Sequence, residues 1–400
     1  MLSKTDNLMT DTAGAANLKI DIIEGVDAIK AFAREWDAAI PPSFTAALGQ
    51  SSWYLSYQDV FPTRRFVVVV ARQEGRIVGL LPLSLEKTDA RGLYFTQVTT
   101  FARGDYQPPI VQPALAEQVL PALVDAAIAY FGRGHVYRWS AIPENHAAAK
   151  VLPAYFESRG MSWARHVEAA SRLNIRERTY EQIEAGWSKS HRGDVRRQRK
   201  RLAEKGAVTL VEPQTIDEAV ALLQEFFDVH DEKWLSQGQP GRFQDPAERR
   251  HFESVLRSMW QRGVMFSALR CGDVNVSFAF GFFSDGWVQW YRPTYRPQYE
   301  KLSPGKVHVA MTLELACQRG WKGIDFLTGA EGYKSQWSDE RLEVHDLYSS
   351  CRAWSPAYLW FTRGKPFVRE RVGPWIAQLK ARLQKIGQRP KLSEPPATSA

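Results

Sequence analysis

The sequence predicts an α+β protein with two tandem units, each a mixed, mainly antiparallel sheet flanked by helices. A length of 400 residues exceeds one ordinary core and suits two domains of about 150–200 residues. Hydrophobic residues make up 44% of the chain and charged residues 24%, which is typical of globular proteins. The same order of helical and strand patterns also appears twice. We place the units at residues 18–175 and 176–355, followed by a basic amphipathic helical extension at 356–388.

The first unit begins with two helical patterns and continues with three strand patterns. Gln73-Glu74-Gly75 separates the first two strands and is typical of a hairpin turn. A loop with three prolines follows, and then a helix, a strand and a helix. The helices are expected at 26–39, 51–60, 115–130 and 145–159, and the strands at 65–71, 76–85, 93–101 and 135–140.

The second unit repeats this order after a basic helical segment at 189–205. Helices are expected at 215–234, 246–262, 306–319 and 331–338, and strands at 264–270, 274–283, 287–292 and 324–328. The order of helix, helix, three antiparallel strands, loop, helix, strand and helix resembles the GNAT (acyl-CoA N-acyltransferase) fold. That resemblance implies central strands that splay apart and admit the cofactor into the gap.

Charge and cysteine content limit the partners and the compartment. The net charge of +8 favours anionic partners, such as a phosphorylated cofactor, an acidic glycan, a phospholipid surface or a nucleic acid, although a solvated surface explains it equally well. Three widely spaced cysteines argue against a disulfide framework or a zinc site. The start of the chain lacks a signal-peptide pattern, and no apolar run has spanning length. We therefore expect a cytoplasmic protein.

The basic extension leaves one question about location open. Its helical pattern at 366–387 has an apolar side and a basic side. Such a helix docks on its own domain or contacts an anionic membrane surface. Peripheral contact with the inner face of the membrane therefore remains an alternative.

A candidate cofactor site precedes the helix predicted at 306–319. Ser303, Pro304 and Gly305 combine a helix-starting residue, a proline and little side-chain bulk, and Lys306 adds a positive charge. Helix N-termini offer unpaired N–H groups and a partial positive charge to a pyrophosphate. The same residues also fit an ordinary helix start with Ser303 as N-cap, so both interpretations stay open.

A polar residue begins the next apolar strand. Asp325 is followed by a glycine turn and then by Tyr333, Lys334 and Trp337. Asp325 is a candidate catalytic residue or a cap of the strand end. Tyr333 lies just past the strand that would border the gap, where a general acid is needed for a departing CoA thiolate.

The stretch from Ser303 to Trp337 resembles the acetyltransferase family named for the cellulose-biosynthesis proteins CelD and BcsL, which is related to the FemAB enzymes. The family's Pro-Gly loop, helix, Asp-Phe strand, glycine, Tyr-Lys and tryptophan are all present. Further matches are Gly104-Asp105-Tyr106, the basic segment at 190–202, and His230-Asp-Glu-Lys-Trp234. Thr328 stands where this family often has an arginine, which puts the substrate preference in doubt.

The remaining candidate residues would bind the acceptor or an anion. Arg192 and Arg196 on the basic helix suit phosphate binding, with a solvated linker face as the alternative. His230 and Trp234 share a helix face. In one interpretation His230 is a base and the Trp234 ring stacks on a sugar; in the other both residues belong to the hydrophobic core. Tyr291, Lys334 and Trp337 complete the predicted acceptor site.

These features predict direct acyl transfer from acyl-CoA, most simply acetyl-CoA, with Tyr333 as the acid and His230 as the base. The resemblance implies an acceptor on an exported polysaccharide or a lipid-linked amino sugar. No metal motif and no DNA-reading motif is found in the sequence. Two alternatives remain: FemAB-like transfer of an amino acid from tRNA, and a catalytically degenerate pair that binds an anionic regulator such as cyclic di-GMP.

Overall fold

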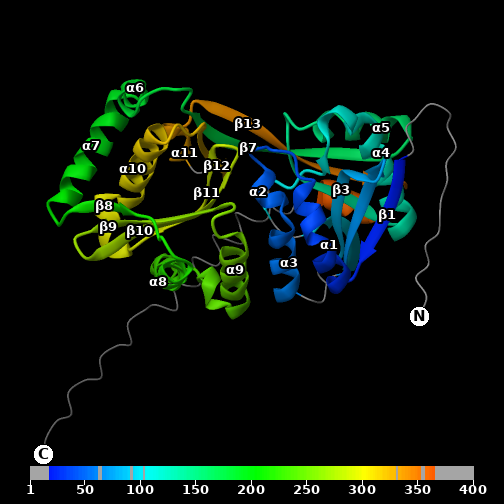
Figure 1. The fold of residues 1–400 in the computed structure, drawn as a ribbon, viewed down its shortest axis with the longest axis horizontal. Helices are drawn as coiled ribbons and strands as arrows, with labels where there is room; N and C mark the ends of the chain where they lie inside the picture. Colours follow the sequence, from blue (N-terminus) through cyan, green and yellow to red (C-terminus); the bar gives the residue numbers. More distant parts are fainter. Residues whose placement is uncertain are drawn as a thin grey trace, which may run out of the picture.

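The computed structural model describes residues 18–61, 65–90, 93–101, 104–329, 332–352 and 356–364. The helix predicted at 366–387 lies outside the described residues. The first half (blue to cyan in Figure 1) and the second half (green to orange) lie side by side.

The first half contains β1 (Leu18–Glu24), α1 (Val26–Ala38), α2 (Ala46–Gly49), α3 (Ser51–Val60), β2 (Arg65–Gln73), β3 (Arg76–Ala90), β4 (Leu93–Thr100), β5 (Ile110–Val111), α4 (Ala116–Phe131), β6 (Val136–Pro143), α5 (Ala148–Ser158) and β7 (Ser162–Asn174). The second half contains α6 (Tyr180–Ala185), α7 (Lys189–Ala203), β8 (Val208–Val211), α8 (Ile216–Ser236), η2 (Arg242–Gln244), α9 (Pro246–Met259), β9 (Val264–Cys271), β10 (Val274–Ser284), β11 (Trp287–Tyr295), η3 (Pro297–Leu302), α10 (Pro304–Gln318), β12 (Gly323–Thr328), α11 (Lys334–Trp337) and β13 (Glu340–Ser350). A short helix, α12 (Pro356–Leu359), and a π-helical turn (Trp360–Gly364) end the described chain.

The two halves share one sheet and exchange their last strands. The strand order is β1-β2-β3-β4-β6-β13-β7-β12-β11-β10-β9-β8, and β5 pairs with β3. β13, from the second half, therefore lies beside β6 of the first, while β7 of the first half lies beside β12 of the second. These two long strands cross between the halves in Figure 1. The predicted boundary at 175/176 follows the end of β7, but the sheet continues across it.

Turn chemistry explains the hairpins within each half. Glu74 and Gly75 link β2 to β3 with φ values of 50° and 77°, and Asp285 and Gly286 link β10 to β11 with 49° and 77°. Two consecutive residues with positive φ match the twist of the flanking strands.

Helices cover both faces of the sheet. The helices α1–α3 and α8–α9 contribute to one apolar cluster that spans both halves. Trp53 of α3, for example, packs edge-on against His251 of α9 and Phe282 of β10. On the opposite face, α4 and α5 cover the first half and α10 covers the second. The shared cluster and the exchanged strands make the halves one structural body.

One helical stretch among the described residues, Pro113–Phe131, is long and apolar enough to cross a membrane. Its α4 portion buries Val119, Leu123 and Ala127 against the sheet. This packing is that of a core helix.

Candidate active site

The central strands of the second half part after a short parallel pairing. Trp287–Gln289 of β11 pairs with Gly323–Asp325 of β12. Beyond these residues, β11 continues along β10 and β12 continues along β7. The GNAT resemblance predicted such a splay, and it lies between the strands expected to border the cofactor.

Backbone irregularities on both strands accompany the separation. The register of β10 with β11 shifts between Phe280 and Phe282, and a Cβ on Gly281 would lie 2.1 Å from the Gln289 carbonyl oxygen. On β12, Leu327 has a φ of 61°, which is costly for a side chain of this size. Both strands therefore bend where they part.

Asp325 holds the bend in β12. Its Oδ1 accepts the Leu327 N–H at 2.8 Å, and its Oδ2 accepts from Arg172 Nε of β7 at 2.8 Å. The Tyr106 hydroxyl lies 3.1 and 3.0 Å from the two carboxylate oxygens. The Asp325 side chain has no exposed surface, and that of Arg172 is 4% exposed. A carboxylate enclosed in this way positions the strand and does not reach an acceptor, so the cap interpretation fits better than the catalytic one.

Burial and pairing act on this carboxylate in opposite directions. Burial raises the pKa of Asp325, whereas Arg172, the Leu327 amide and Tyr106 lower it, and the net direction is upward. The guanidinium of Arg172 also lies 3.8 Å from the centre of the Phe44 ring. The first half thus supplies both side chains that bind Asp325, Arg172 and Tyr106, and the ring that packs on Arg172.

A related arrangement occurs in the first half. β4 and β6 pair in parallel over Gln97–Thr99 and Val136–Arg138, and Ala141 of β6 has a φ of 50°. The Ala141 N–H donates to Asp346 of β13 at 2.8 Å, and Arg138 pairs with the same carboxylate at 2.5 Å. An Asp–Arg pair therefore holds a bend in both halves, and each pair joins residues from the two halves.

The predicted cofactor turn lies at the start of α10. Ser303 has a left-handed conformation with φ 46° and ψ 54°. A Cβ on Gly305 would meet only the Tyr295 ring, at 3.9 Å, so the turn is open on this side. The amides of Lys306 and Val307 point back to the Ser303 carbonyl, and the Lys306 ammonium pairs with Asp194 of α7. The cofactor role of residues 303–306 remains a prediction.

The basic helix α7 places different cations beside this turn from those predicted. Arg192 donates to the Ala185 carbonyl, and Arg196 pairs with Glu184, so both turn toward α6. Arg201 instead donates to the Lys301 carbonyl at 3.1 Å, immediately before the turn. Arg201 is therefore the better candidate for a contact with a phosphate at α10.

The Tyr-Lys-x-x-Trp segment combines an exposed residue with buried ones. Tyr333 is 38% exposed, and Lys334 Nζ donates to the Thr328 carbonyl at 2.6 Å, which ties the segment to the end of β12. Trp337 is 2% exposed and packs against Trp187 and His191. Lys334 and Trp337 therefore support the fold, and Tyr333 is the member that a substrate can reach.

His230 is poorly suited to the predicted role of base. It is buried, and its Nε2 accepts from Trp234 Nε1 at 3.1 Å. Burial, followed by the charges of Arg292 and two further cations, lowers its pKa to about 3. Nε2, the nitrogen that would take the acceptor's proton, already accepts the hydrogen bond from Trp234. Tyr291 is also enclosed, because its ring packs against Trp53 and Phe282 in the shared cluster.

Sequence reasoning missed the partners that the first half contributes. Tyr106 and Asp105 belong to a quoted Gly-Asp-Tyr match, but no role was assigned to either. The Thr328 hydroxyl donates to Asp105, so this partly exposed carboxylate lies at the end of β12. Arg172 had no local signal, because its importance depends on the pairing of β7 with β12, which is far from it in sequence.

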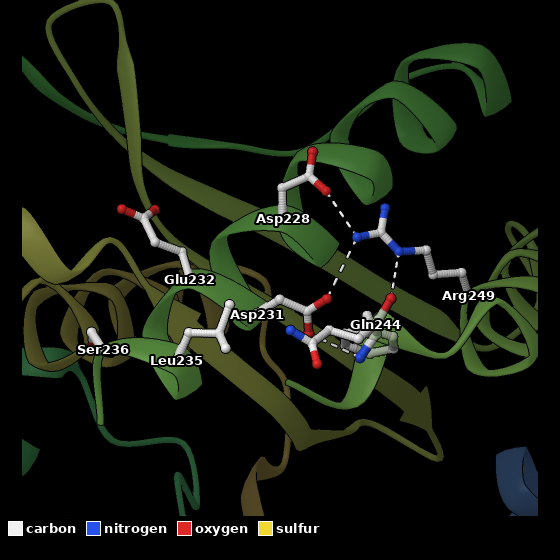
Figure 2. Close-up of a pocket in the computed structure, with 8 residues that line it drawn as sticks. Asp228, Asp231, Glu232, Leu235, Ser236, Gln244 and Arg249 are labelled. Carbon is white, nitrogen blue, oxygen red and sulfur yellow. Dashed lines mark hydrogen bonds and ion pairs between the residues drawn. The ribbon is translucent and has the colours of Figure 1, made fainter. Parts of the chain in front are cut away.

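A hollow on the described surface lies elsewhere. It has a volume of about 680 Å³ and lies beside α8 and η2. Figure 2 shows Arg249 between Asp228 and Asp231, with Glu232 nearby. The hollow is shallow and acidic, which does not suit a pyrophosphate, so we place the candidate site at the splay. Within the described ranges, no three His, Cys, Asp or Glu side chains are grouped to hold a metal ion.

Comparisons with known proteins agree with this fold. Residues 189–335 match the family model described as an acetyltransferase (GNAT) domain. FemX superposes with a TM-score of 0.55 at 12% identity, covering 78% of this chain and 95% of FemX. L-PGS from Bacillus licheniformis gives 0.51 at 14% identity, covering 84% of this chain and 96% of that protein. The C-terminal domain of a putative lysylphosphatidylglycerol synthetase from Agrobacterium fabrum gives 0.52 at 11% identity, covering 85% and 97%.

No curated protein matches the chain by sequence. The structural neighbours therefore establish the fold, and their substrates do not transfer to this chain. The second half thus matches an acetyltransferase (GNAT) domain model, and the chain shares the fold of FemX over 78% of its length; together these findings support acyltransferase activity.

Proposed function

We propose that this protein transfers an acyl group, most simply acetyl, from acyl-CoA to an amine or hydroxyl of a sugar. The observation that carries the proposal is the splay of β11 from β12 beside the open turn at Gly305. The GNAT resemblance puts a coenzyme thioester in such a gap, and a helix N-terminus favours its diphosphate.

The reaction needs no covalent enzyme intermediate. The acceptor attacks the thioester carbonyl, a C–N or C–O bond forms, and the C–S bond breaks. Tyr333 would supply a proton to the departing CoA sulfur, and backbone amides near the splay would stabilise the carbonyl oxygen as charge develops. Because His230 is occupied by Trp234, Asp105 is the carboxylate we propose to take the acceptor's proton.

Two variants at Gly305 test the cofactor site. Gly305→Ala fits the available space, because its Cβ would meet only the Tyr295 ring at 3.9 Å. Gly305→Arg would fill the volume that a diphosphate needs. We expect calorimetry with CoA to show near-normal binding by Gly305→Ala and loss of binding by Gly305→Arg. Equal affinities in the two variants would rule out this turn as the diphosphate site.

Replacing Tyr333 tests the chemistry separately from binding. Tyr333→Phe keeps the ring and removes only the hydroxyl. We expect acyl transfer to slow by about 100-fold or more, the range typical of a lost general acid, with unchanged CoA affinity. A normal rate in Tyr333→Phe would exclude the hydroxyl as the acid.

The resemblance to the CelD/BcsL family favours a sugar of an exported polysaccharide or a lipid-linked amino sugar as the acceptor. Comparing secreted polysaccharide by mass spectrometry, with and without the protein, tests this assignment. Acyl groups unchanged in the absence of the protein would exclude an exported polysaccharide.

Transfer of an amino acid from tRNA is a second candidate, favoured by the exposed basic surface of α7. Arg196 and Arg197 have side chains that are 67% and 63% exposed. Aminoacyl-tRNA turnover without CoA binding would favour this route. CoA binding without turnover on any amino-sugar acceptor would instead favour a degenerate pair that responds to an anionic regulator such as cyclic di-GMP.

A further inference from the structure

Arg292 of β11 has a buried polar atom that nothing in the described structure satisfies. Its Nε is buried and has no hydrogen-bond partner, and no ion pair to Arg292 is found among the described residues. Arg296, four residues further on, differs in both respects. It pairs with Glu225 at 2.6 Å, and its Nε donates to the Asn275 carbonyl at 2.8 Å.

Arg292 lies in the part of β11 that has separated from β12. Its Cα is opposite Phe280 of β10, whose side chain belongs to the cluster beneath α8 and α9. The guanidinium lies 4.7 Å from the centre of the Tyr291 ring. Its charge also helps to lower the pKa of His230, after the larger effect of burial, so Arg292 lies near this residue of α8.

Charges of both signs lie near Arg292, but none is found in an ion pair with it among the described residues. Arg242 and Glu248 form their own pair at 2.9 Å. Burial acts to lower the pKa of Arg292, whereas Tyr291 and Asp105 raise it, and the net direction is upward. Asp105 accepts its hydrogen bond from Thr328. Lys233 adds a second cation near His230, with its Nζ 4.5 Å from the centre of the Tyr295 ring. The Nε of Arg292 therefore remains a donor without a partner in the described structure.

We propose that Arg292 binds an anionic group, a carboxylate or a phosphate, on the acceptor. A guanidinium with a free N–H is well matched to either oxyanion. Leaving a buried charged donor unpaired is costly, so a site that retains one is best explained by a ligand that completes it. The inference rests on the proposed acyl transfer and narrows its acceptor to an acidic or phosphorylated sugar.

Three sugars distinguish the chemistry. The full-length protein would be titrated by calorimetry with glucosamine, with muramic acid, which adds a carboxylate, and with glucosamine 6-phosphate. We expect one of the two anionic sugars to bind at least about 10-fold more tightly than glucosamine, and which one does so separates carboxylate from phosphate. Equal affinity for all three sugars, or no binding of either anionic sugar, would overturn the proposal.

Substitutions then assign the preference to Arg292. Arg292→Met should weaken binding of the preferred anion by about 10- to 100-fold and leave glucosamine unaffected. Arg292→Lys, which keeps the charge but loses the planar donor, should fall between Arg292→Met and the wild type. Arg296→Met is the matched control, since Arg296 is already paired, and it should retain the preference. An unchanged anion preference in Arg292→Met, or an equal loss for glucosamine, would refute the assignment.

The CoA titration keeps the two proposals separable. Each variant is also titrated with CoA alone, and its thermal unfolding is recorded to confirm folding. If the wild-type protein does not bind CoA, the proposed acyl transfer is refuted, and the anion preference can still be measured. Normal CoA binding without an anion preference would defeat only the role of Arg292.

Discussion

Replacing Asp325 with asparagine would leave the guanidinium of Arg172 buried without its counter-charge. In the native structure the carboxylate accepts from Arg172, Tyr106 and the Leu327 amide. An asparagine of the same size has one acceptor oxygen and would present an NH₂ group to at least one of these donors. Removing one partner of a buried pair typically costs about 3–5 kcal/mol, and we expect a loss of that size in the free energy of unfolding.

The second Asp–Arg pair gives a matched control. Asp346 also accepts a backbone N–H at a strand bend and pairs with Arg138, but the two side chains are 24% and 32% exposed. Water can solvate the guanidinium when its partner is neutralised. Asp346→Asn should therefore cost only about 1–2 kcal/mol.

Urea unfolding, followed by tryptophan fluorescence and by circular dichroism, measures both variants. Arg172→Met/Asp325→Asn should recover part of the loss, because it removes the unpaired buried guanidinium and keeps an acceptor oxygen for the Leu327 amide or Tyr106. A cost below about 1 kcal/mol for Asp325→Asn, or one no larger than that for Asp346→Asn, would refute the view that this buried pair stabilises the junction.

Two further substitutions probe the splay and its surroundings. Gly281→Ala should lower the free energy of unfolding by on the order of 2 kcal/mol, because the added Cβ would overlap the Gln289 carbonyl oxygen. The control, Gly193→Ala on α7, has no atom within 4 Å of the added Cβ and should be neutral or stabilising by up to about 1 kcal/mol. Equal unfolding midpoints for the two variants would contradict this expectation. The pKa of His230 in the folded state, about 3, lies below its value in the unfolded chain, about 6.5. The unfolded chain therefore binds a proton first, and the free energy of unfolding falls as the pH drops below about 6.5. His230→Gln keeps an acceptor for Trp234, and its free energy of unfolding should fall by about 2 kcal/mol less than that of the wild type between pH 7 and pH 5. If the two proteins have parallel curves of unfolding free energy against pH, His230 does not contribute to the pH dependence.

The sequence predicted the local elements well where each has its own pattern. The expected helix at 51–60 coincides with α3, and the strands at 264–270 and 324–328 lie within β9 and β12. These segments carry regular apolar periodicity between clear turn residues. The Gly-Asp-Tyr and Asp-Phe motifs also come together in space, since Tyr106 donates to Asp325.

The exchanged strands could not be predicted in the same way. β7 and β13 have polar sequences with few β-branched residues, and only part of each is buried. They are strands because each lies between two others, and those neighbours are distant in sequence. The pair of Asp325 with Arg172, separated by 153 positions, follows from this exchange, so no local pattern could have assigned Arg172.

The exchange explains why the first half matters to a site that lies in the second. Gln289 is the last residue of β11 that pairs with β12, and its side chain donates to the Phe44 carbonyl at 2.5 Å. Its partner on β12 is Asp325, which binds Arg172 and Tyr106. Both strands are thus fixed by the first half at the point where they separate. A second half expressed alone would lack β7 and these donors, so the bend at Leu327 would lose its support from Arg172. The first half is therefore a structural part of the candidate active site, and its lack of a Pro-Gly/Asp-Phe/Tyr-Lys series of its own is consistent with that role.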